Sequence, residues 1–439
     1  MRPRNSLSVS LSLLAISALI ALGANAQTRT MAVDDILKYK VPSDPQLSPD
    51  GSRALFVLSQ WDFKENLGNT DIYLISATGG ESLKLTNGPK RDYYPRLSPD
   101  GSLIAFLSDR PDRGSSDGGD DKREKAQIYL INPSGGEAWK LTESKTAISS
   151  FEWSHDGKRI AYVSPDTLSV QEEKQQKEKD DSKVVDEKFQ MSHISVIDVV
   201  TKKAVRRTSG SFNVDNVSWS PDGKWLAFSA RPTPKVPDNF KTDVYIVSAD
   251  SGDAKKIVDR HGPDSNPRFS PDGRTIAFTS MDGKADDWIA NTNLCIVPAS
   301  GGTITNLSKS FDENVGAFRW SRDGKVIYFQ ALTKTAGHLF VLSVESKQVR
   351  QVTSGEDSYG FFSFSEDFKK VVFLKQNPNT APDLYFAELS SMNPMKLTTL
   401  NPQLKEIKLG TGEIVHWKGT DGMDIEGVLI KPVGYEKGR

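Results

Sequence analysis

Cysteine is nearly absent from this sequence, since Cys295 is the only one among 439 residues. A single cysteine excludes a disulfide within the chain, and its place in an apolar segment is typical of a small buried side chain rather than a nucleophile. Histidine is scarce as well, and no histidine has another His, Asp or Glu at metal-ligand spacing on the same predicted element. We therefore predict no metal or other cofactor. The five histidines, all interpreted as structural or solvent-facing, are His155, His193, His261, His338 and His416.

The chain also lacks an excess of charge of either sign. Its 56 Lys and Arg residues and 57 Asp and Glu residues give a net charge of −1. No overall field therefore attracts nucleic acid or an anionic membrane, which argues against a polyanion as the main partner.

Long apolar runs are missing except near the N-terminus, at residues 7–22. This run is short for a membrane span and no basic stop-transfer flank follows it. With the basic residues before it and the small residues 24–26 after it, the run predicts a secretory signal peptide over residues 1–26, cleaved between Ala26 and Gln27. We expect a periplasmic or secreted mature protein without a membrane segment; a retained anchor is the lesser alternative.

One short phrase is repeated along most of the chain. In residues 97–106 a strand runs into Ser-Pro-Asp-Gly, and alternating apolar residues follow. Proline presets φ at the first corner of a type I turn, aspartate folds back onto backbone N–H groups, and glycine takes the left-handed position, so the phrase predicts a β-hairpin. Further copies lie at residues 47–56, 153–162, 219–228, 269–278, 320–329 and, decayed, 364–373.

The period of this repeat indicates a propeller. The turn glycines are 50, 56, 66, 50 and 51 residues apart, and Phe368 takes the place of glycine 44 residues after the last of them. Self-similarity at such a period is the signature of a propeller or another repeat array. An apolar third strand and a short fourth strand, such as residues 84–86 or 396–398, complete each unit. The sequence thus predicts an all-β fold, a seven-bladed β-propeller of four-stranded blades over residues 41–400.

Three segments stand apart from the regular blades. Residues 27–40 form a leader in which residues 31–40 predict a short amphipathic helix with early acids and late lysines. Residues 111–125 are rich in Gly, Ser and Asp, but Asp117, Asp120 and Asp121 lack the register of a calcium loop. Residues 166–188 carry mixed charge, typical of a solvated helix or loop; the functional alternative is a lid or contact arm on one face of the disc.

After residue 400 the repeat gives way to a different pattern. Residues 413–420 and 423–432 alternate on either side of Asp421 and Gly422, which is a strong hairpin signal. This hairpin belongs to no blade, and a two-stranded unit is barely stable alone. We therefore expect residues 401–439 to begin a second domain whose other elements lie outside this sequence.

Together these parts resemble the prolyl oligopeptidase family of serine peptidases, most closely its acylaminoacyl-peptidase and dipeptidyl-peptidase-like bacterial members. The resemblance covers the mature chain and is carried by the leader 33–37 running into residues 43–51, by residues 106–110, and by the closing hairpin with Gly427 and Pro432. It implies that residues 401–439 enter an α/β-hydrolase domain, the natural partner of the propeller.

The resemblance also implies catalytic residues that this sequence does not contain. In the family, serine lies in a Gly-x-Ser-x-Gly elbow between a strand and a helix, and aspartate and histidine follow later. The one matching pattern, residues 114–118, lies in a hydrophilic insert without a preceding apolar strand, so it cannot form the elbow. We assign no catalytic residue and expect the chain to be inactive as given. Substrate-binding residues stay unassigned, because Asp109 and Arg110 are as typical of a structural corner as of a peptide grip.

The function expected from the sequence is the substrate-gating propeller of a secreted or periplasmic serine exopeptidase or oligopeptidase that acts on short peptides. The alternative is a non-enzymatic propeller of the translocation (Tol) type that binds a protein partner, which explains the repeat but not the terminal hairpin. A propeller-fold lyase with a histidine-bound metal would need convergent histidines, which the spacing does not suggest.

Overall fold

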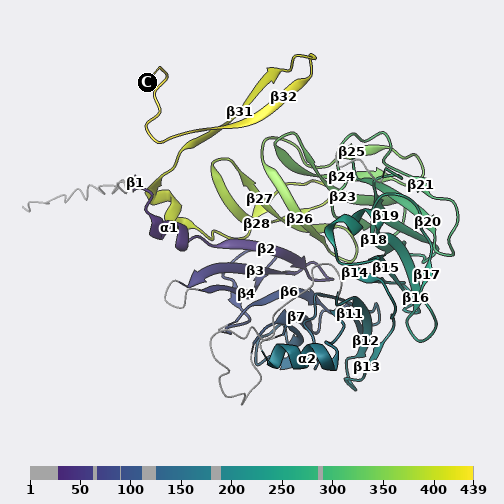
Figure 1. Ribbon diagram of the computed structural model, residues 1–439. Helices are drawn as coiled ribbons and strands as arrows, with labels where there is room; N and C mark the ends of the chain where they lie inside the picture. The colour runs from purple at the N-terminus through teal and green to yellow at the C-terminus, as the bar shows by residue number, and fades with distance from the viewer. Residues whose placement is uncertain are drawn as a thin grey trace, which may run out of the picture.

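The computed structural model describes residues 28–62, 67–88, 90–110, 125–178, 189–284 and 290–438 (Figure 1). Seven four-stranded antiparallel sheets follow one another along the chain, and in each sheet the strands pair in sequence order. The predicted seven-bladed β-propeller is confirmed. The predicted cleavage site at Ala26 and Gln27, the pattern at residues 114–118 and the three aspartates Asp117, Asp120 and Asp121 lie outside the described residues.

The blades take their strands in order. Blade one contains β2 (Val41–Leu47), β3 (Arg53–Asp62), β4 (Leu67–Ser76) and β5 (Leu83–Lys84), and blade two contains β6 (Asp92–Leu97), β7 (Ile104–Ser108), β8 (Gln127–Ile131) and β9 (Trp139–Lys140). Blade three contains β10 (Ser150–Trp153), β11 (Arg159–Pro165), β12 (Ser192–Asp198) and β13 (Ala204–Arg206), and blade four contains β14 (Asn213–Trp219), β15 (Trp225–Arg231), β16 (Asp243–Ser248) and β17 (Lys255–Lys256). Blade five contains β18 (Asp264–Phe269), β19 (Thr275–Ser280), β20 (Asn293–Pro298) and β21 (Thr305–Asn306). Blade six contains β22 (Phe318–Trp320), β23 (Val326–Thr333), β24 (Ala336–Ser343) and β25 (Val349–Gln351), and blade seven contains β26 (Ser358–Phe364), β27 (Lys370–Asn377), β28 (Thr380–Glu388) and β29 (Met395–Lys396).

The repeated turn forms as its residue types predict. In blade two the Gly101 N–H donates to the Ser98 carbonyl at 2.8 Å, and Gly101 has φ +70°. The Ser98 hydroxyl donates to the Asp100 carboxylate at 2.5 Å, and this carboxylate accepts the Ser102 N–H at 3.0 Å. The side chains of the turn therefore satisfy the backbone groups that the strands leave unpaired.

A hydroxyl ties the short fourth strand to the third. In six blades a Thr or Ser oxygen just after the fourth strand accepts a backbone N–H of the third strand at 2.8 to 3.0 Å. Blade four has Val258 at this place. The hydroxyl residues are Thr86, Thr142, Thr208, Ser308, Thr353 and Thr398.

The core lies between neighbouring blades. An aromatic residue of the second strand is fully buried in six blades, and blade three has Tyr162 at 6% exposure in that place. Large flat side chains at one repeated position fill the space between sheets and supply much of the burial that stabilises the fold. The six phenylalanines are Phe56, Phe106, Phe228, Phe278, Phe329 and Phe373.

The ring closes without exchange of a strand between its first and last blades. Blade one is built only from β2–β5 and blade seven only from β26–β29. One core cluster includes Leu47 and Phe56 from blade one with Val372 and Leu384 from blade seven. Closure therefore depends on side-chain packing and on a few hydrogen bonds across the seam.

Segments on both sides of the propeller clasp this seam. The short strands β1 (Arg29–Thr30) and β30 (Ile407–Lys408) pair in parallel. The Asn401 side chain accepts the Lys40 N–H at 2.8 Å and donates to the Lys40 carbonyl at 2.8 Å. The 3-10 helix η2 (Pro402–Glu406) lies between these contacts, so residues 401–408 belong to the clasp.

The leader helix differs from its prediction. Helix α1 covers only Val33–Leu37, not residues 31–40, and it is not amphipathic in the expected sense. Val33 and Ile36 are exposed, whereas Asp35 is 4% exposed and pairs with Arg29 at 2.6 Å. The ion pair between Asp35 and Arg29 of β1 decides which face of α1 is buried. The spacing of apolar residues in the sequence cannot reveal such a contact.

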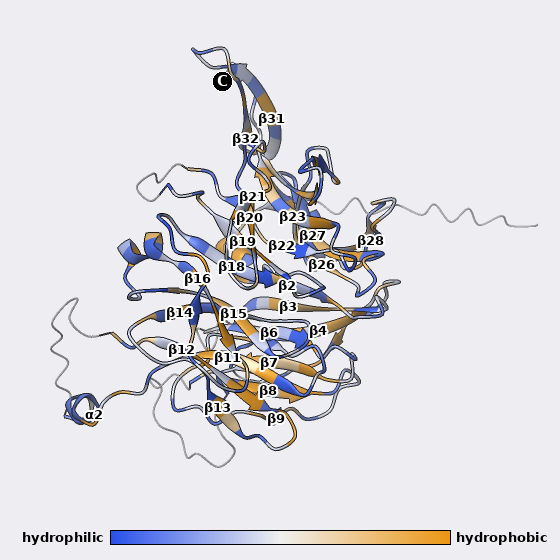
Figure 2. Cartoon of the chain, turned by 90° about the vertical axis from the view of Figure 1, so that its right-hand side faces the viewer, coloured by the Kyte–Doolittle hydropathy of each residue, from blue (hydrophilic) through white to orange (hydrophobic). Residues whose placement is uncertain are grey.

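The described residues contain few helices. Helix α2 (Val170–Lys177) and the 3-10 helix η1 (Val236–Lys241) both lie between second and third strands, and α2 is hydrophilic after its first residue, Val170 (Figure 2). Within the described ranges, no helix has the length and apolarity needed to cross a membrane.

Candidate functional site

The two faces of the disc carry different features. In each blade the turn of the repeat, Ser-Pro-Asp-Gly or its variant, joins the first and second strands, so these turns share one face, which we call the turn face. The connections between second and third strands emerge on the opposite face because the strands alternate in direction. All blades repeat one topology, so α2 and η1, which lie between second and third strands, are also on that opposite face.

The terminal hairpin docks on this opposite face, which we call the hairpin face. The hairpin consists of β31 (Thr411–Lys418) and β32 (Asp424–Lys431) and extends away from the propeller (Figure 1). The Thr335 hydroxyl of blade six donates to Glu426 at 2.5 Å. Asn379 of blade seven exchanges two hydrogen bonds with the backbone of Gly412, at 2.9 and 2.8 Å. A Cβ at position 412 would lie 2.3 Å from the Pro378 side chain, so only glycine permits this approach.

Apolar side chains of the hairpin are left open. Trp417 is 49% exposed and Ile430 is 69% exposed, and Met423, Val428 and Leu429 are exposed as well. Val428 and Ile430 lie on one face of the hairpin and Leu429 on the other, so apolar side chains are open on both faces. Exposed apolar surface of this kind marks an interaction site in soluble proteins. The hairpin therefore contacts the propeller at Gly412 near its base and at Glu426 closer to its turn, and it leaves these apolar side chains open.

Seven side chains form a ring inside the central channel. The residue two positions before the turn serine has the same place in every blade, as the strand register shows for Arg96 opposite Ala105 and for Arg268 opposite Ala277. These residues line two adjoining cavities, of about 500 and 690 Å³. We call this set the channel ring. It consists of Gln46, Arg96, Glu152, Ser218, Arg268, Arg319 and Ser363.

Tryptophans brace the backbone of the ring. The Trp153 indole donates to the Arg96 carbonyl at 3.1 Å, and the Trp219 indole donates to the Glu152 carbonyl at 3.0 Å. The Trp320 indole does the same for the carbonyl of Arg268 at 3.2 Å. Each bond runs from one blade to the one before it, so the ring residues are held by the packing between blades.

Two of the three ring arginines have carboxylate partners. Arg96 lies 2.8 Å from Asp44, and Arg268 lies 2.5 Å from Glu152. Asp44 has a left-handed φ of +45°, and Tyr94, two residues before Arg96, has a left-handed φ of +57°. Both lie at β-bulges of the first strands of their blades. Bulges re-aim side chains, and here the Arg96 guanidinium lies 3.7 Å from the Tyr94 ring centroid.

Arg319 differs from the other two. Among the described residues no carboxylate lies within 4 Å of it, and its one hydrogen bond is to the Phe318 carbonyl at 3.3 Å. Arg319 is exposed to water in the channel although protein atoms surround it, and it borders the cavities on both sides of the ring. The charge of Arg268, and after it burial, lower the pKa of Arg319 to about 10, so it remains a cation at neutral pH.

The strand-end residues Asp109 and Arg110 are structural. Asp109 pairs with Arg91 at 2.9 Å and Arg110 pairs with Asp92 at 2.8 Å. The Arg110 guanidinium also lies 4.9 Å from the Tyr129 ring centroid. These contacts are all within blade two, so the pair forms a corner of the blade and does not project toward a ligand.

The histidines are dispersed. His193 and His338 are buried at the start of third strands, where their Nδ1 atoms lie 3.3 and 3.2 Å from Thr208 and Thr353. Burial lowers the pKa of both side chains, so both are neutral at pH 7. His416 lies 3.5 Å from Glu426 in the hairpin. Across the part of the chain that the structure describes, no three His, Cys, Asp or Glu side chains form a group that suits a metal ion.

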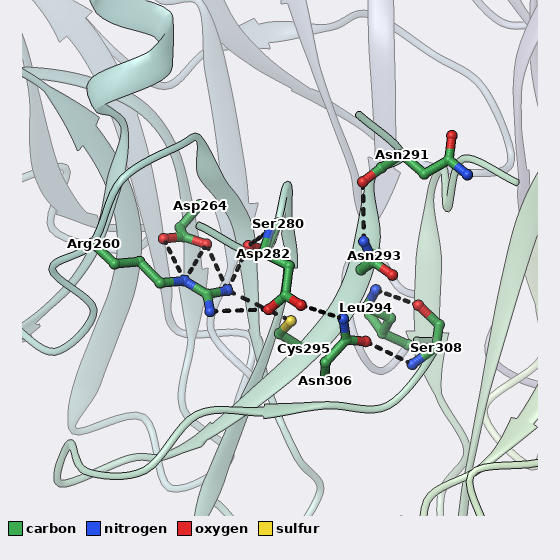
Figure 3. Close-up of polar contacts among 10 residues, drawn as sticks. All are labelled: Arg260, Asp264, Ser280, Asp282, Asn291, Asn293, Leu294, Cys295, Asn306 and Ser308. Carbon is green, nitrogen blue, oxygen red and sulfur yellow. Dashed lines mark hydrogen bonds and ion pairs between the residues drawn. The ribbon is translucent and has the colours of Figure 1, made fainter. Parts of the chain in front are cut away.

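Cys295 belongs to a polar network in blade five (Figure 3). Arg260 hydrogen-bonds Asp264 at 3.2 Å and Ser280 at 2.5 Å, and it reaches the Cys295 sulfur at 3.6 Å. Burial raises the pKa of the Cys295 thiol to about 11, so it stays protonated and is a poor nucleophile. The network stabilises the blade.

Known proteins share this architecture. A profile of the TolB β-propeller domain matches residues 27–196. Dipeptidyl-peptidase 5 of Porphyromonas gingivalis is 24% identical over 431 residues, which cover 90% of this chain and 60% of that protein. The uncharacterized peptidase YuxL of Bacillus subtilis is 26% identical over 93% of this chain and 64% of its own length. The chain is a homologue of these peptidases.

Solved structures agree in fold. The acylaminoacyl peptidase of Pyrococcus horikoshii superposes with a TM-score of 0.69 at 20% identity, over 92% of this chain and 59% of its own. The β-propeller domain of the trilobed protease from Pyrococcus furiosus, described as having an open velcro topology, superposes with a TM-score of 0.59 at 18% identity, over 83% of this chain and 99% of its own. The resemblance to the prolyl oligopeptidase family is confirmed. This peptidase homologue spans between 53% and 64% of the length of the first three curated relatives.

Sequence reasoning missed the channel ring. Its signal was present, because an alignment of the seven repeats on the turn serine shows three arginines and one glutamate in a single column. Such a column has meaning only once the first strand of each blade is known to face the channel.

Proposed function

We propose that this chain is the substrate-gating propeller of a secreted or periplasmic serine peptidase that acts on short peptides. The docked hairpin on the hairpin face carries this proposal. It joins no blade, it is fixed to blades six and seven through Glu426 and Gly412, and it presents an apolar surface that suits packing against an α/β-hydrolase domain. The homologous peptidases are longer than the matched region, which is consistent with such an arrangement.

The role of the propeller follows from its rigidity. A closed ring of blades over an active site admits short extended peptides and excludes folded chains by size, and the enclosed cavity keeps the acyl-enzyme chemistry away from competitors in bulk solution. In the complete enzyme a serine would attack the peptide carbonyl, a histidine would move the proton, and an aspartate would orient the histidine. All three would belong to the hydrolase domain, and the propeller residues would bind and orient the peptide.

The test is a comparison of two polypeptides on dipeptidyl and N-acyl-aminoacyl chromogenic substrates, with a serine-directed fluorophosphonate probe. We expect the 439-residue chain to show neither turnover nor labelling. A polypeptide that continues it with the hydrolase domain encoded downstream should show both. Labelling of the 439-residue chain itself would place a reactive serine within the blades and contradict the proposal.

A Tol-type binding propeller is the second candidate, since the TolB domain profile matches residues 27–196. It predicts that the longer polypeptide cleaves no peptide and instead retains a protein partner. Sequencing the N-terminus of the mature protein tests the location, because the predicted signal cleavage would leave Gln27 as the first residue.

A further inference from the structure

The channel ring has the properties of a binding site for an anionic group. We propose that Arg319, with Arg96 and Arg268 beside it, binds a carboxylate of a peptide inside the propeller channel. The inference rests on the proposed peptide-handling function and adds to it a recognised chemical group and the residues that recognise it.

The charge count of the ring supports a monoanion. Within the ring, three guanidinium groups stand against the carboxylates of Asp44 and Glu152, which leaves one positive charge in excess. Arg322 and Glu366, which also line the cavities, pair with each other at 3.9 Å, and Asp100 and Asp156 accept hydrogen bonds within their own turns. That excess is located at Arg319, because the other two arginines already have partners. Like charges near one another in a partly enclosed site cost free energy unless an anion is present. A single carboxylate restores balance, whereas a multiply charged anion would face Glu152 and Asp44.

Arg319 borders open cavities, and the backbone of the neighbouring ring residues is held in place. Its guanidinium can donate a two-pronged pair of hydrogen bonds to a carboxylate, the interaction for which arginine is best suited. The neighbouring ring backbones are fixed by the indoles of Trp153, Trp219 and Trp320. A site with little freedom to lose binds its ligand more tightly.

The hydroxyl of Ser218 is a second ring group that is open to a ligand. Ser218 is 2% exposed and lines the same cavity, and within the described part of the chain its buried hydroxyl has no hydrogen-bond partner. Buried hydroxyls are nearly always satisfied, so an unsatisfied one at a cavity wall points to a ligand or water.

The rest of the cavity suits a peptide chain. Tyr94, Phe269, Trp320 and Phe368 contribute aromatic surface around the arginines. Arg319 borders cavities toward both the turn face and the hairpin face, so an extended ligand has room on either side of the bound carboxylate. The channel therefore offers apolar walls with one charged recognition point, which is the usual construction of a specific ligand site.

The test uses the intact purified chain and isothermal titration calorimetry. The probes are the peptide N-acetyl-Gly-Pro-Ala-Phe with a free C-terminal carboxylate, the same peptide as its amide, and inorganic phosphate. The variants are Arg319→Gln and, as a matched control, Arg350→Gln, which removes an exposed arginine from the outer strand β25 of the same blade. Thermal unfolding of each variant reports whether its fold is intact.

We expect the free acid to bind the wild type at least tenfold more tightly than the amide. Arg319→Gln should weaken binding of the free acid about ten- to hundredfold, the usual effect of losing a charge-assisted hydrogen-bonded pair. It should leave binding of the amide unchanged, and Arg350→Gln should change neither. Because Arg319 stands beside Arg268 without a carboxylate, its replacement should not lower Tm.

Four results would overturn the inference. Equal binding of acid and amide, unaffected by Arg319→Gln, would remove carboxylate recognition while leaving the peptide-handling function in place. Phosphate binding that depends on Arg319, without binding of the free acid, would make the ring a general anion site. A large fall in Tm for Arg319→Gln would make Arg319 a structural residue. Absence of binding by every probe would mean that the ring binds no carboxylate. The hydrolysis assays judge the proposed function separately.

Discussion

At the scale of the residue, the decayed turn of blade seven shows how much the glycine of the repeat matters. Phe368 has φ +54°, the left-handed conformation that Gly101 has at +70° in blade two. A side chain there costs roughly 1 kcal/mol or more of strain. Phe368 is retained by stacking, since its ring centroid lies 5.1 Å from that of Phe364 and 6.0 Å from that of Tyr328.

A pair of substitutions separates strain from stacking. Phe368→Ala loses the ring contacts and keeps the strain, whereas Phe368→Gly loses both. We therefore expect Phe368→Gly to be about 1 kcal/mol more stable than Phe368→Ala in denaturant unfolding. If alanine were equal to or better than glycine, the left-handed conformation at position 368 would carry no cost. The same comparison at Gly101, where a Cβ would meet only ordinary contacts, should show Gly101→Ala to be destabilising by a similar amount.

The turn aspartates make a prediction about acid. The Ser48 hydroxyl lowers the pKa of Asp50 to about 2, and serine hydroxyls lower the pKa of the corresponding aspartate in each of the other six turns. In the unfolded chain these carboxyls take up protons near pH 4. Between about pH 4 and pH 2 the unfolded state therefore binds more protons, and stability falls as the pH falls.

Replacing several turn aspartates tests this link. A variant with Asp100→Asn, Asp222→Asn and Asp272→Asn should show a shallower fall of Tm between about pH 4 and pH 2 than the wild type. A matched variant carrying Asp34→Asn, an exposed carboxylate outside the turns, should keep the slope of the wild type. An unchanged slope in the triple variant would mean that other carboxylates control acid unfolding.

At the scale of the element, the terminal hairpin combines contacts to the propeller with open apolar side chains. Its two strands pair over their whole length, but neither has a further strand beside it. Unpaired edges next to exposed apolar side chains favour association. Ile430, at 69% exposure, is the most open of the large apolar side chains on its strand.

The hairpin should accordingly mediate self-association of the isolated chain. Ile430→Lys is expected to shift the protein toward monomer in sedimentation velocity experiments at micromolar concentration. Val200→Lys replaces an even more exposed apolar residue in a turn of blade three and serves as the control. If both variants or neither changed the distribution, the hairpin would not be the associating surface.

At the scale of the whole molecule, closure of the ring depends on a few contacts that are distant in sequence. Leu47 donates its N–H to the Ser363 hydroxyl at 3.0 Å, and Glu366 donates its N–H to the Pro49 carbonyl at 2.9 Å. Asn401 adds the two bonds to Lys40. Because no strand is shared between blades one and seven, these bonds and the common core stabilise the seam.

Two asparagines with the same bonding pattern allow a controlled test. Asn401→Ala removes two hydrogen bonds at the seam and should lower the free energy of unfolding by about 1–3 kcal/mol. It should also speed hydrogen exchange in β2 and β26. Asn379→Ala removes the equivalent pair to Gly412 and should speed exchange in the hairpin only. Equal exchange in the seam of both variants would show that Asn401 does not clasp the ring.

The sequence by itself determined the local and repeated parts of this protein. The Ser-Pro-Asp-Gly turns, the strand order within blades and the number of blades follow from residue types that act over a few positions, and each copy confirms the others. The hairpin around Gly422 is local in the same way. Such features are readable because turn chemistry and period are properties of neighbouring residues.

Only the tertiary structure decided which distant residues meet. The seven members of the channel ring, from Gln46 to Ser363, are each unremarkable in their own strand, and they form one electrostatic environment because the blades close around an axis. The buried face of α1 is likewise set by Arg29 on a strand of the clasp. Charge–charge interactions and burial depend on separation in space, and the folded ring brings together residues that the chain keeps about 50 positions apart.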